Sequence, residues 1–235
     1  AVLRELKKDL HLDCMTITGE TLGERLAADV DWVDETVIAR AEKPIEPVGG
    51  LVALFGSLAP QGAILKRSAA DANLFEKEGR AVVFTSLDDL ANRIDDPDLD
   101  VTADDFLVLQ NAGPFSSSCM PEAGYIPIPK KLAVAGVKDM VRLSDARMSG
   151  TAFGTVILHI TPDAASGGAL AYVKNGDRIR LSVKNRTIDL LVSEADMAER
   201  RIAMPLAKPQ TPPRGYARLY AQEILGADEG CDFKF

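Results

Sequence analysis

The sequence predicts an α/β protein whose centre is a mixed β-barrel with flanking helices. Short apolar segments bounded by turn residues recur through the chain after residue 45, as is typical of strands buried on one or both faces. Capped helical segments alternate with some of them. Two further segments form a hairpin pattern. This mixture of strand–helix alternation and hairpins favours a mixed sheet or barrel with helices on the outside.

The first part of the chain has few strand patterns. It predicts a helix end at 1–10, an extended piece at 14–18 and a second helix at 19–29. The segment 31–47 is polar and ends in KPIEP, whose prolines favour an extended linker. We therefore expect a boundary near residue 45. Because the amphipathic pattern begins without a capping residue, we also expect the chain to be the later part of a longer polypeptide.

The remaining elements follow in order. Six apolar segments predict strands, at 51–55, 63–66, 81–84, 106–110, 140–143 and 155–160. Ser86 and Ser193 are candidate N-caps of helices at 86–94 and 193–203, because each has an aspartate three residues later. The alternating segments 178–183 and 187–192 flank KNR and predict a hairpin, although this turn lacks glycine.

Composition excludes several classes of partner and site. The chain has 235 residues, is 46% hydrophobic and carries a net charge of −8, and it has no basic run that could follow a phosphate backbone, so we expect no nucleic-acid partner. Its apolar stretches are too short for a membrane span and its first residues do not resemble a signal peptide, so we expect a soluble, cytoplasmic protein. Cys14, Cys119 and Cys231 are too scattered for a disulfide framework, a structural zinc site or a complete iron–sulfur site.

Ser149 lies in the segment LSDARMSGTAFG, residues 143–154. A serine acts as a base or nucleophile only when a neighbour removes or offsets its proton. The two histidines are His11 and His159, and His159 lies in a strand-like segment where a core or loop role is the more common one. No GxSxG elbow is present. From these residues alone, Ser149 is either a turn residue that bonds the backbone or an activated hydroxyl.

Glu122 follows Met-Pro in a loop rich in glycine, proline and serine. A carboxylate in such a loop suits Mg²⁺, which prefers oxygen ligands and often takes only one or two carboxylates besides water and substrate. A single glutamate is more often a solvated loop residue. The loop GSLAPQG at 56–62 is no P-loop, since it lacks the GK[ST] ending.

Taken in order, several stretches resemble the C-terminal half of the IlvD/Edd dehydratases. The likeness covers nearly the whole chain, and SDARMSGTAFG is more similar to the aldonate branch than to the branched-chain enzymes. The stretches that carry it are MTITGETLGE, GGLVALFGSLAPQGAILK, NAGPFSSSCMPE, the region from MVRLSDARMSGTAFG through HITPDAASGG to SEADMAERR, and RGYARLYAQEILGADEGCDF.

The resemblance implies a swivelling β/β/α domain of the LeuD/IlvD-like type at 45–235, with 1–44 as linker and tail of a missing N-terminal domain. It implies a hydro-lyase that converts a 2,3-dihydroxy sugar acid, such as an aldonate, to a 2-keto-3-deoxy acid. By the same resemblance, Ser149 is the catalytic base, Thr151 and Gly150 bind substrate, and Glu122 is a Mg²⁺ ligand. An iron–sulfur cluster would be held by the missing domain, so this chain alone would be inactive. Homo-oligomers, dimers or tetramers, are also implied.

Three alternatives stay open. The chain could belong to a dihydroxy-acid dehydratase of branched-chain amino-acid synthesis, or it could be a stand-alone swivelling-domain binding module. A small subunit of an isopropylmalate-isomerase-like enzyme shares the fold, but the SGT and MPE loops argue against it. One departure concerns the substrate: the family's loop is glycine-rich, whereas this chain has GPFSSSCMPE with Phe115 and three serines.

Overall fold

The computed structural model describes residues 1–27, 33–122, 126–147, 149, 153–206 and 211–235. Its contacts divide the chain into two units, Ala1–Gly49 and Gly50–Phe235. The first unit holds the helices α1 (Val2–Glu5) and α2 (Leu22–Arg25) and a 3₁₀ helix, Lys7–Asp9. Both expected helices are therefore present but shorter than predicted.

Helix α2 is short, but its start is well defined. The Thr21 hydroxyl accepts a hydrogen bond from the Glu24 backbone N–H, and the Glu24 carboxylate accepts one from the Thr21 N–H at 2.7 Å. This reciprocal capping box satisfies two of the backbone donors that a helix leaves unpaired at its N-terminus.

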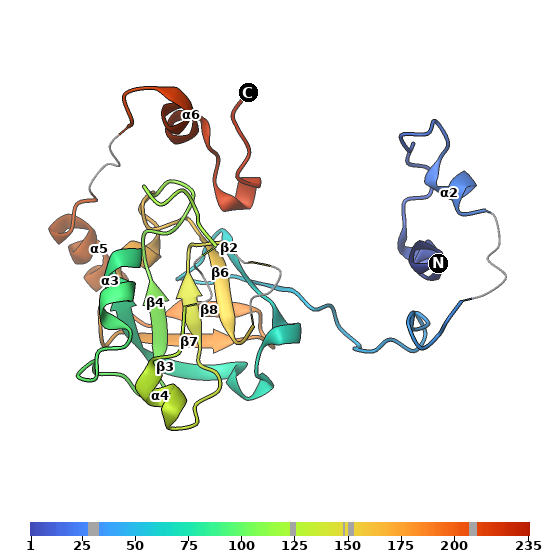
Figure 1. The fold of residues 1–235 in the computed structure, drawn as a ribbon. Helices are drawn as coiled ribbons and strands as arrows, with labels where there is room; N and C mark the ends of the chain where they lie inside the picture. Colours follow the sequence, from blue (N-terminus) through green and yellow to red (C-terminus); the bar gives the residue numbers. More distant parts are fainter. Residues whose placement is uncertain (28–32, 123–125, 148, 150–152, 207–210) are drawn as a thin grey trace. The chain divides into compact units, whose positions relative to one another are not determined.

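The second unit is organised around one eight-stranded mixed sheet (Figure 1). The strand order is β1-β2-β6-β5-β4-β3-β7-β8, and β3 to β6 are parallel neighbours, whereas the strands on either side pair antiparallel. The strands are β1 Val52–Leu54, β2 Gly62–Leu65, β3 Glu76–Phe84, β4 Phe106–Leu109, β5 Arg142–Ser144, β6 Val156–Thr161, β7 Arg178–Ser182 and β8 Thr187–Leu190.

The two edges of this sheet approach each other. A parallel bridge joins Phe55, just after β1, to Thr187 at the start of β8, and the Phe55 N–H donates to the Arg186 carbonyl at 2.9 Å. The sheet is thereby nearly closed, which removes most of the exposed strand edge. The predicted mixed barrel is confirmed.

Side-chain alternation along the strands creates two apolar cores. Val83 and Val108 belong to the larger core, which gathers residues from all eight strands, whereas Val82 and Leu107 belong to a smaller core on the other face. Because neighbouring strand residues point to opposite faces, the central parallel strands need apolar residues at every position. This explains why their sequences are continuous apolar runs.

The helices of the second unit cover the sheet and its ends. The predicted caps are confirmed: Ser86 accepts from the Asp89 N–H at the start of α3, and Ser193 accepts from the Asp196 N–H at the start of α5. The helices are α3 Leu87–Arg93, α4 Lys130–Val134, α5 Glu194–Ala203 and α6 Gly215–Glu223, with 3₁₀ helices at Arg67–Ala69, Ala72–Leu74, Ala169–Tyr172 and Ala227–Glu229. Within the described ranges, no helix has both the length and the apolar character that a bilayer crossing needs.

One predicted strand starts later than expected. Strand β5 begins at Arg142 rather than at residue 140, although Met140 and Val141 are fully buried. The hairpin of β7 and β8 is confirmed, and Arg186 adopts a φ of 56°, the left-handed conformation that usually favours glycine.

A buried ion pair stabilises the entry to β5. Arg142 donates to Asp139 at 2.8 Å, and the two side chains are only 6% and 7% exposed. Asp139 also accepts from the Thr155 hydroxyl at 2.7 Å, immediately before β6. Gly154 approaches this pair closely, with a φ of 101°, and a side chain there would overlap the Arg142 guanidinium. The final glycine of SDARMSGTAFG is therefore required by packing.

Two buried aspartates hold the loops that follow the parallel strands. Asp145, directly after β5, accepts hydrogen bonds from the backbone N–H groups of Ala112 and Ala164, both at 2.9 Å. Asp163, after β6, accepts from the Phe115 N–H at 2.9 Å and the Ser166 N–H at 2.7 Å. The loops after β4, β5 and β6 are thus bound to one another at the carboxyl end of the sheet.

We predict that Asp139→Ala strongly destabilises the fold, by about 3–5 kcal/mol, because it leaves the buried Arg142 guanidinium without its counter-charge. Urea unfolding should show this as a lower midpoint with an unchanged slope. The matched control is Asp104→Ala, whose partner is Lys77 at 2.7 Å but whose side chain is 89% exposed, and which should cost less than about 1 kcal/mol. Equal losses in the two variants would contradict this account.

Asp145 predicts a pH dependence of stability. Burial, followed by the nearby Asp163 charge, raises its pKa from 3.8 to about 6 despite the opposing backbone hydrogen bonds. The folded state therefore holds this proton more tightly than the unfolded state, so the group's contribution to stability is largest below pH 4 and falls as pH rises to about 6. The stability of the wild type relative to Asp145→Asn should decrease by up to about 3 kcal/mol between pH 4 and 7. A difference that stays constant or increases over this range would refute the assignment.

Candidate functional site

The candidate site lies at the carboxyl end of the parallel strands. The loops after β4, β5 and β6 contain the segments NAGPFSSSCMPE, DARMSGTAFG and PDAASGG, and they meet at the same end of the sheet (Figure 1). In sheets and barrels with parallel strands, ligands bind at this end because the loops there converge while the backbone of the strands stays rigid.

Ser149 lies in the loop between β5 and β6 and is partly buried. It follows β5 by five residues, and the neighbouring Asp145 ties the start of its loop to the loops after β4 and β6. Gly150 and Thr151, the expected substrate-binding residues, lie outside the described residues. The catalytic role of Ser149 stays a prediction.

Glu122 is joined to the loop that carries Ser149. Its carboxylate accepts from the Arg147 guanidinium at 2.5 Å, and the side chains of Arg147 and Glu122 are 47% and 49% exposed. Arg147 precedes Ser149 by two residues. The structure therefore brings together the two loops that the sequence singled out, at a solvent-accessible position.

His159 lies next to this ion pair, within β6. Its φ of 56° and the shifted pairing between β2 and β6 mark a bulge, and its N–H donates to the Ala146 carbonyl at 3.0 Å. Burial, and then the positive charge of Arg147, lower the pKa of the imidazole. A histidine with a lowered pKa stays neutral at pH 7, and the bulge turns its side chain differently from a regular strand residue.

The described residues provide few metal ligands. Within that part of the chain, no cluster of three or more His, Cys, Asp or Glu side chains could hold a metal ion. Cys14 lies in the first unit, and Cys119 and Cys231 lie in the second. The Cys231 thiol contacts the Met120 sulfur at 3.3 Å, and burial raises its pKa, so it is less reactive than a free thiol.

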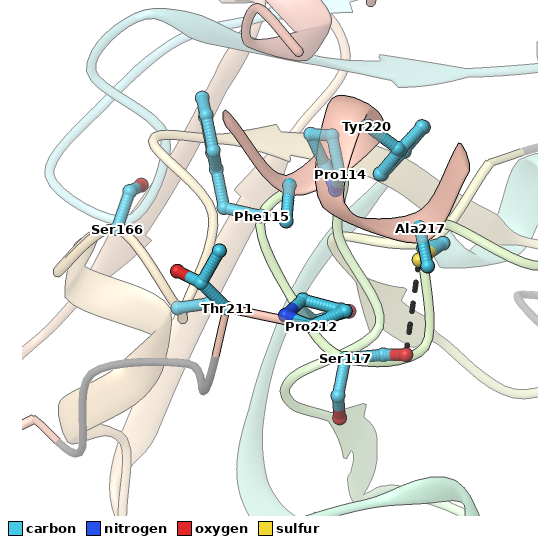
Figure 2. A pocket seen from close by; sticks show the side chains of 12 residues that line it. Pro114, Phe115, Ser117, Ser166, Thr211, Pro212, Ala217 and Tyr220 are labelled. Atoms are coloured by element: carbon cyan, nitrogen blue, oxygen red, sulfur yellow. Dashed lines mark hydrogen bonds between the residues drawn. The ribbon is translucent and has the colours of Figure 1, made fainter. Parts of the chain in front are cut away.

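A cavity of about 380 Å³ lies between the loop after β4 and helix α6 (Figure 2). Its described lining carries no charged side chain, and neither Ser149 nor Glu122 contributes to it. Burial raises the pKa of Tyr220 in its wall to about 12, so the phenol stays protonated. The loop contributes Pro114, Phe115, Ser116, Ser117 and Cys119, and the helix contributes Ala217, Tyr220 and Ala221. The segment GPFSSSC, which departs from the glycine-rich loop that the resemblance implies, thus forms part of this cavity wall.

Sequence reasoning missed three residues of this region: Asp145, Arg147 and Asp163. All three lie in loops that the sequence marks as glycine-bearing, and Asp145 and Arg147 are within the serine motif itself. In the structure, a side chain at Gly113 would overlap the Asp163 carboxylate, so this glycine is required by the close approach of the two loops. Without coordinates, an aspartate that binds backbone N–H groups cannot be distinguished from a solvated one.

Comparison with known proteins places this chain in a family. A family model described as "Dihydroxy-acid/6-phosphogluconate dehydratase C-terminal" matches residues 36–231. The chain is similar to an L-arabinonate dehydratase of Rhizobium leguminosarum, at 47% identity over 226 residues, which cover 96% of this chain and 39% of that protein. It is also similar to a 6-deoxy-6-sulfo-D-gluconate dehydratase of Pseudomonas putida, at 44% identity over 100% of this chain and 41% of that protein.

Relatives named for another substrate are less similar. A dihydroxy-acid dehydratase of Oleidesulfovibrio alaskensis is 37% identical over 97% of this chain and 41% of that protein. The chain spans about two fifths of the length of the relatives it matches. Since the family match covers residues 36–231 and thus most of this chain, this chain belongs to the dihydroxy-acid/6-phosphogluconate dehydratase C-terminal family.

Proposed function

We propose that this chain is the C-terminal part of a hydro-lyase that dehydrates a 2,3-dihydroxy sugar acid, such as an aldonate, to a 2-keto-3-deoxy acid. The observation that carries the proposal is the Glu122–Arg147 ion pair, which joins the MPE loop to the serine loop at the carboxyl end of the parallel strands. Among the four relatives at 44–47% identity, three are named as sugar-acid dehydratases and one as a dehydratase without a named substrate, and these names support the substrate class.

The alternatives receive less support. Dihydroxy-acid dehydratases are 36–38% identical to this chain, and a sugar-acid substrate is therefore the better proposal. A stand-alone binding module would not need an ion pair that joins the loop of Glu122 to the loop of Ser149. We place the first 44 residues with a preceding domain, and 45–235 as the domain that completes the active site.

A divalent cation fits the described residues in part. Glu122 offers one carboxylate that is half exposed, and Mg²⁺ often takes one or two protein carboxylates with water and substrate as its other ligands. The described cysteines do not form a cluster site, so we place iron–sulfur ligands elsewhere in the full-length protein. Bound metals would supply Lewis acidity, which lowers the pKa of a hydroxyl and stabilises a departing hydroxide.

The residues of this chain would remove the proton and hold the loops of the site in position. Ser149, as an alkoxide, would take the proton from the carbon next to the carboxylate, and the hydroxyl on the following carbon would leave as hydroxide. The resulting enol gains a proton at carbon and becomes the 2-keto acid. Asp145 would hold the three loops in fixed positions relative to one another. This matters because small displacements of a catalytic group greatly lower the rate.

Ser149→Ala in the intact protein should lower kcat about 10²- to 10⁴-fold, because it removes the proposed base. The measurement is 2-oxo acid formation from a panel of pentonates and hexonates, with metal and iron content determined on the same samples. Ser118→Ala is the control, because the hydroxyl of this loop serine donates at 3.4 Å to the Asn111 carbonyl and makes no other hydrogen bond with the described residues. Turnover by Ser149→Ala near the wild-type rate would reject the role of the base.

Glu122→Gln should weaken Mg²⁺ binding about tenfold or more while the fold stays intact, since it removes a charged ligand at an exposed position. Calorimetric titration of the intact protein with Mg²⁺ measures this directly. Glu78→Gln is a matched control, because Glu78 also pairs with an arginine, Arg178, at 3.1 Å. Unchanged Mg²⁺ affinity in Glu122→Gln would remove this residue from the ligand set.

A further inference from the structure

Arg147 occupies a position that no structural requirement of the barrel explains. It is half exposed, and it pairs with a half-exposed carboxylate. Ion pairs in such surroundings contribute little to stability, because water competes for both charges. The pair nevertheless joins the residue proposed to bind a cation with the loop that carries the proposed base. Stability therefore does not account for the Glu122–Arg147 ion pair, and its position at the candidate site points to a role there.

The guanidinium has unused donor capacity. One Nη group donates to Glu122, and within the part of the chain that the structure describes this is the one hydrogen-bond acceptor that Arg147 contacts. An arginine carries five N–H donors in a planar fork that matches the two oxygens of a carboxylate. The remaining donors lie on a solvent-accessible side chain, two residues from Ser149.

The charges of the site set a constraint. A divalent cation that takes the Glu122 carboxylate competes with Arg147 for the same oxygens, so the guanidinium must give up its partner or share it. A positive group next to a bound cation then needs another anion. The sugar acid of the proposed function brings one, its carboxylate, to the same loops.

We propose that Arg147 is the counter-ion of Glu122 in the metal-free protein and that, once a divalent cation binds Glu122, its guanidinium binds the substrate carboxylate. This proposal rests on the proposed function for its second half. Arg147 is then a substrate-binding residue that also keeps Glu122 from carrying an uncompensated charge. It would favour acids over uncharged sugars of the same shape, because a bidentate site for a carboxylate is poorly filled by a neutral group.

The first half is tested by metal titration without substrate. Arg147→Met in the intact protein removes the competing cation, so Mg²⁺ should bind about two- to fivefold more tightly, as expected for the loss of an exposed ion pair. Arg180→Met is the matched control, because Arg180 pairs with Glu78 at 3.1 Å and is similarly exposed, and it should leave the affinity unchanged. Unchanged or weaker Mg²⁺ binding in Arg147→Met overturns the counter-ion role.

The second half is tested by comparing charged and neutral ligands. In Arg147→Met, KM for the sugar acid should rise about tenfold to hundredfold, as expected for lost hydrogen bonds to a charged group, with a smaller change in kcat. Arg147→Lys should give an intermediate KM, because it keeps the charge but loses the planar fork. Inhibition by the acid's uncharged amide should be equal in the wild type and Arg147→Met. An unchanged KM, or equal losses for acid and amide, overturns the substrate contact.

Failure of the two proposals can be separated. If the wild-type protein forms no 2-oxo acid from any pentonate or hexonate, the proposed function fails, and with it the substrate contact of Arg147. The Mg²⁺ titration does not depend on turnover, so it decides the counter-ion role in either case.

Discussion

The fully buried Asp145 carboxylate is the interaction on which the arrangement of this site depends. It follows β5 and binds the backbone N–H groups of Ala112 and Ala164, so it couples the loops that leave β4, β5 and β6. Backbone donors in such loops would otherwise be left unpaired or would need water. A carboxylate with two acceptor oxygens can satisfy a donor from each neighbouring loop. The cost is the desolvation that raises its pKa.

The two ion pairs of this region differ in burial, and burial decides whether their members can exchange partners. Asp139 and Arg142 are almost fully buried and maintain the entry to β5. Each makes a further hydrogen bond, Asp139 as acceptor from the Thr155 hydroxyl and Arg142 as donor to the Met140 carbonyl. Glu122 and Arg147 also form a carboxylate–guanidinium pair, but both side chains are half exposed and lie on loops. Water and incoming ions reach the second pair, so its members can exchange partners. The first pair cannot do this without unfolding its surroundings.

Membership of the dehydratase C-terminal family and the geometry of the loops support each other. The loops that carry Glu122 and Ser149 lie within the matched residues 36–231 and converge at the carboxyl end of the parallel strands. Phe115, Ser116, Ser117 and Cys119, where the sequence departs from the glycine-rich loop that the resemblance implies, are part of a cavity wall against α6. Bulky and hydroxyl-bearing residues there form part of the surface of this cavity, to which neither Ser149 nor Glu122 contributes.

The sequence by itself determined the mixed barrel, because buried strands need apolar runs and the caps at Ser86 and Ser193 mark where helices begin. It also identified the loops of Glu122 and Ser149, since their motifs are local in the chain. Only the tertiary structure decided that Arg147 pairs with Glu122 and that Asp145 binds two other loops. In the structure, helices α1 and α2 also end earlier than their sequence patterns predict. These outcomes depend on contacts between residues distant in sequence, whose partners and burial no local pattern encodes.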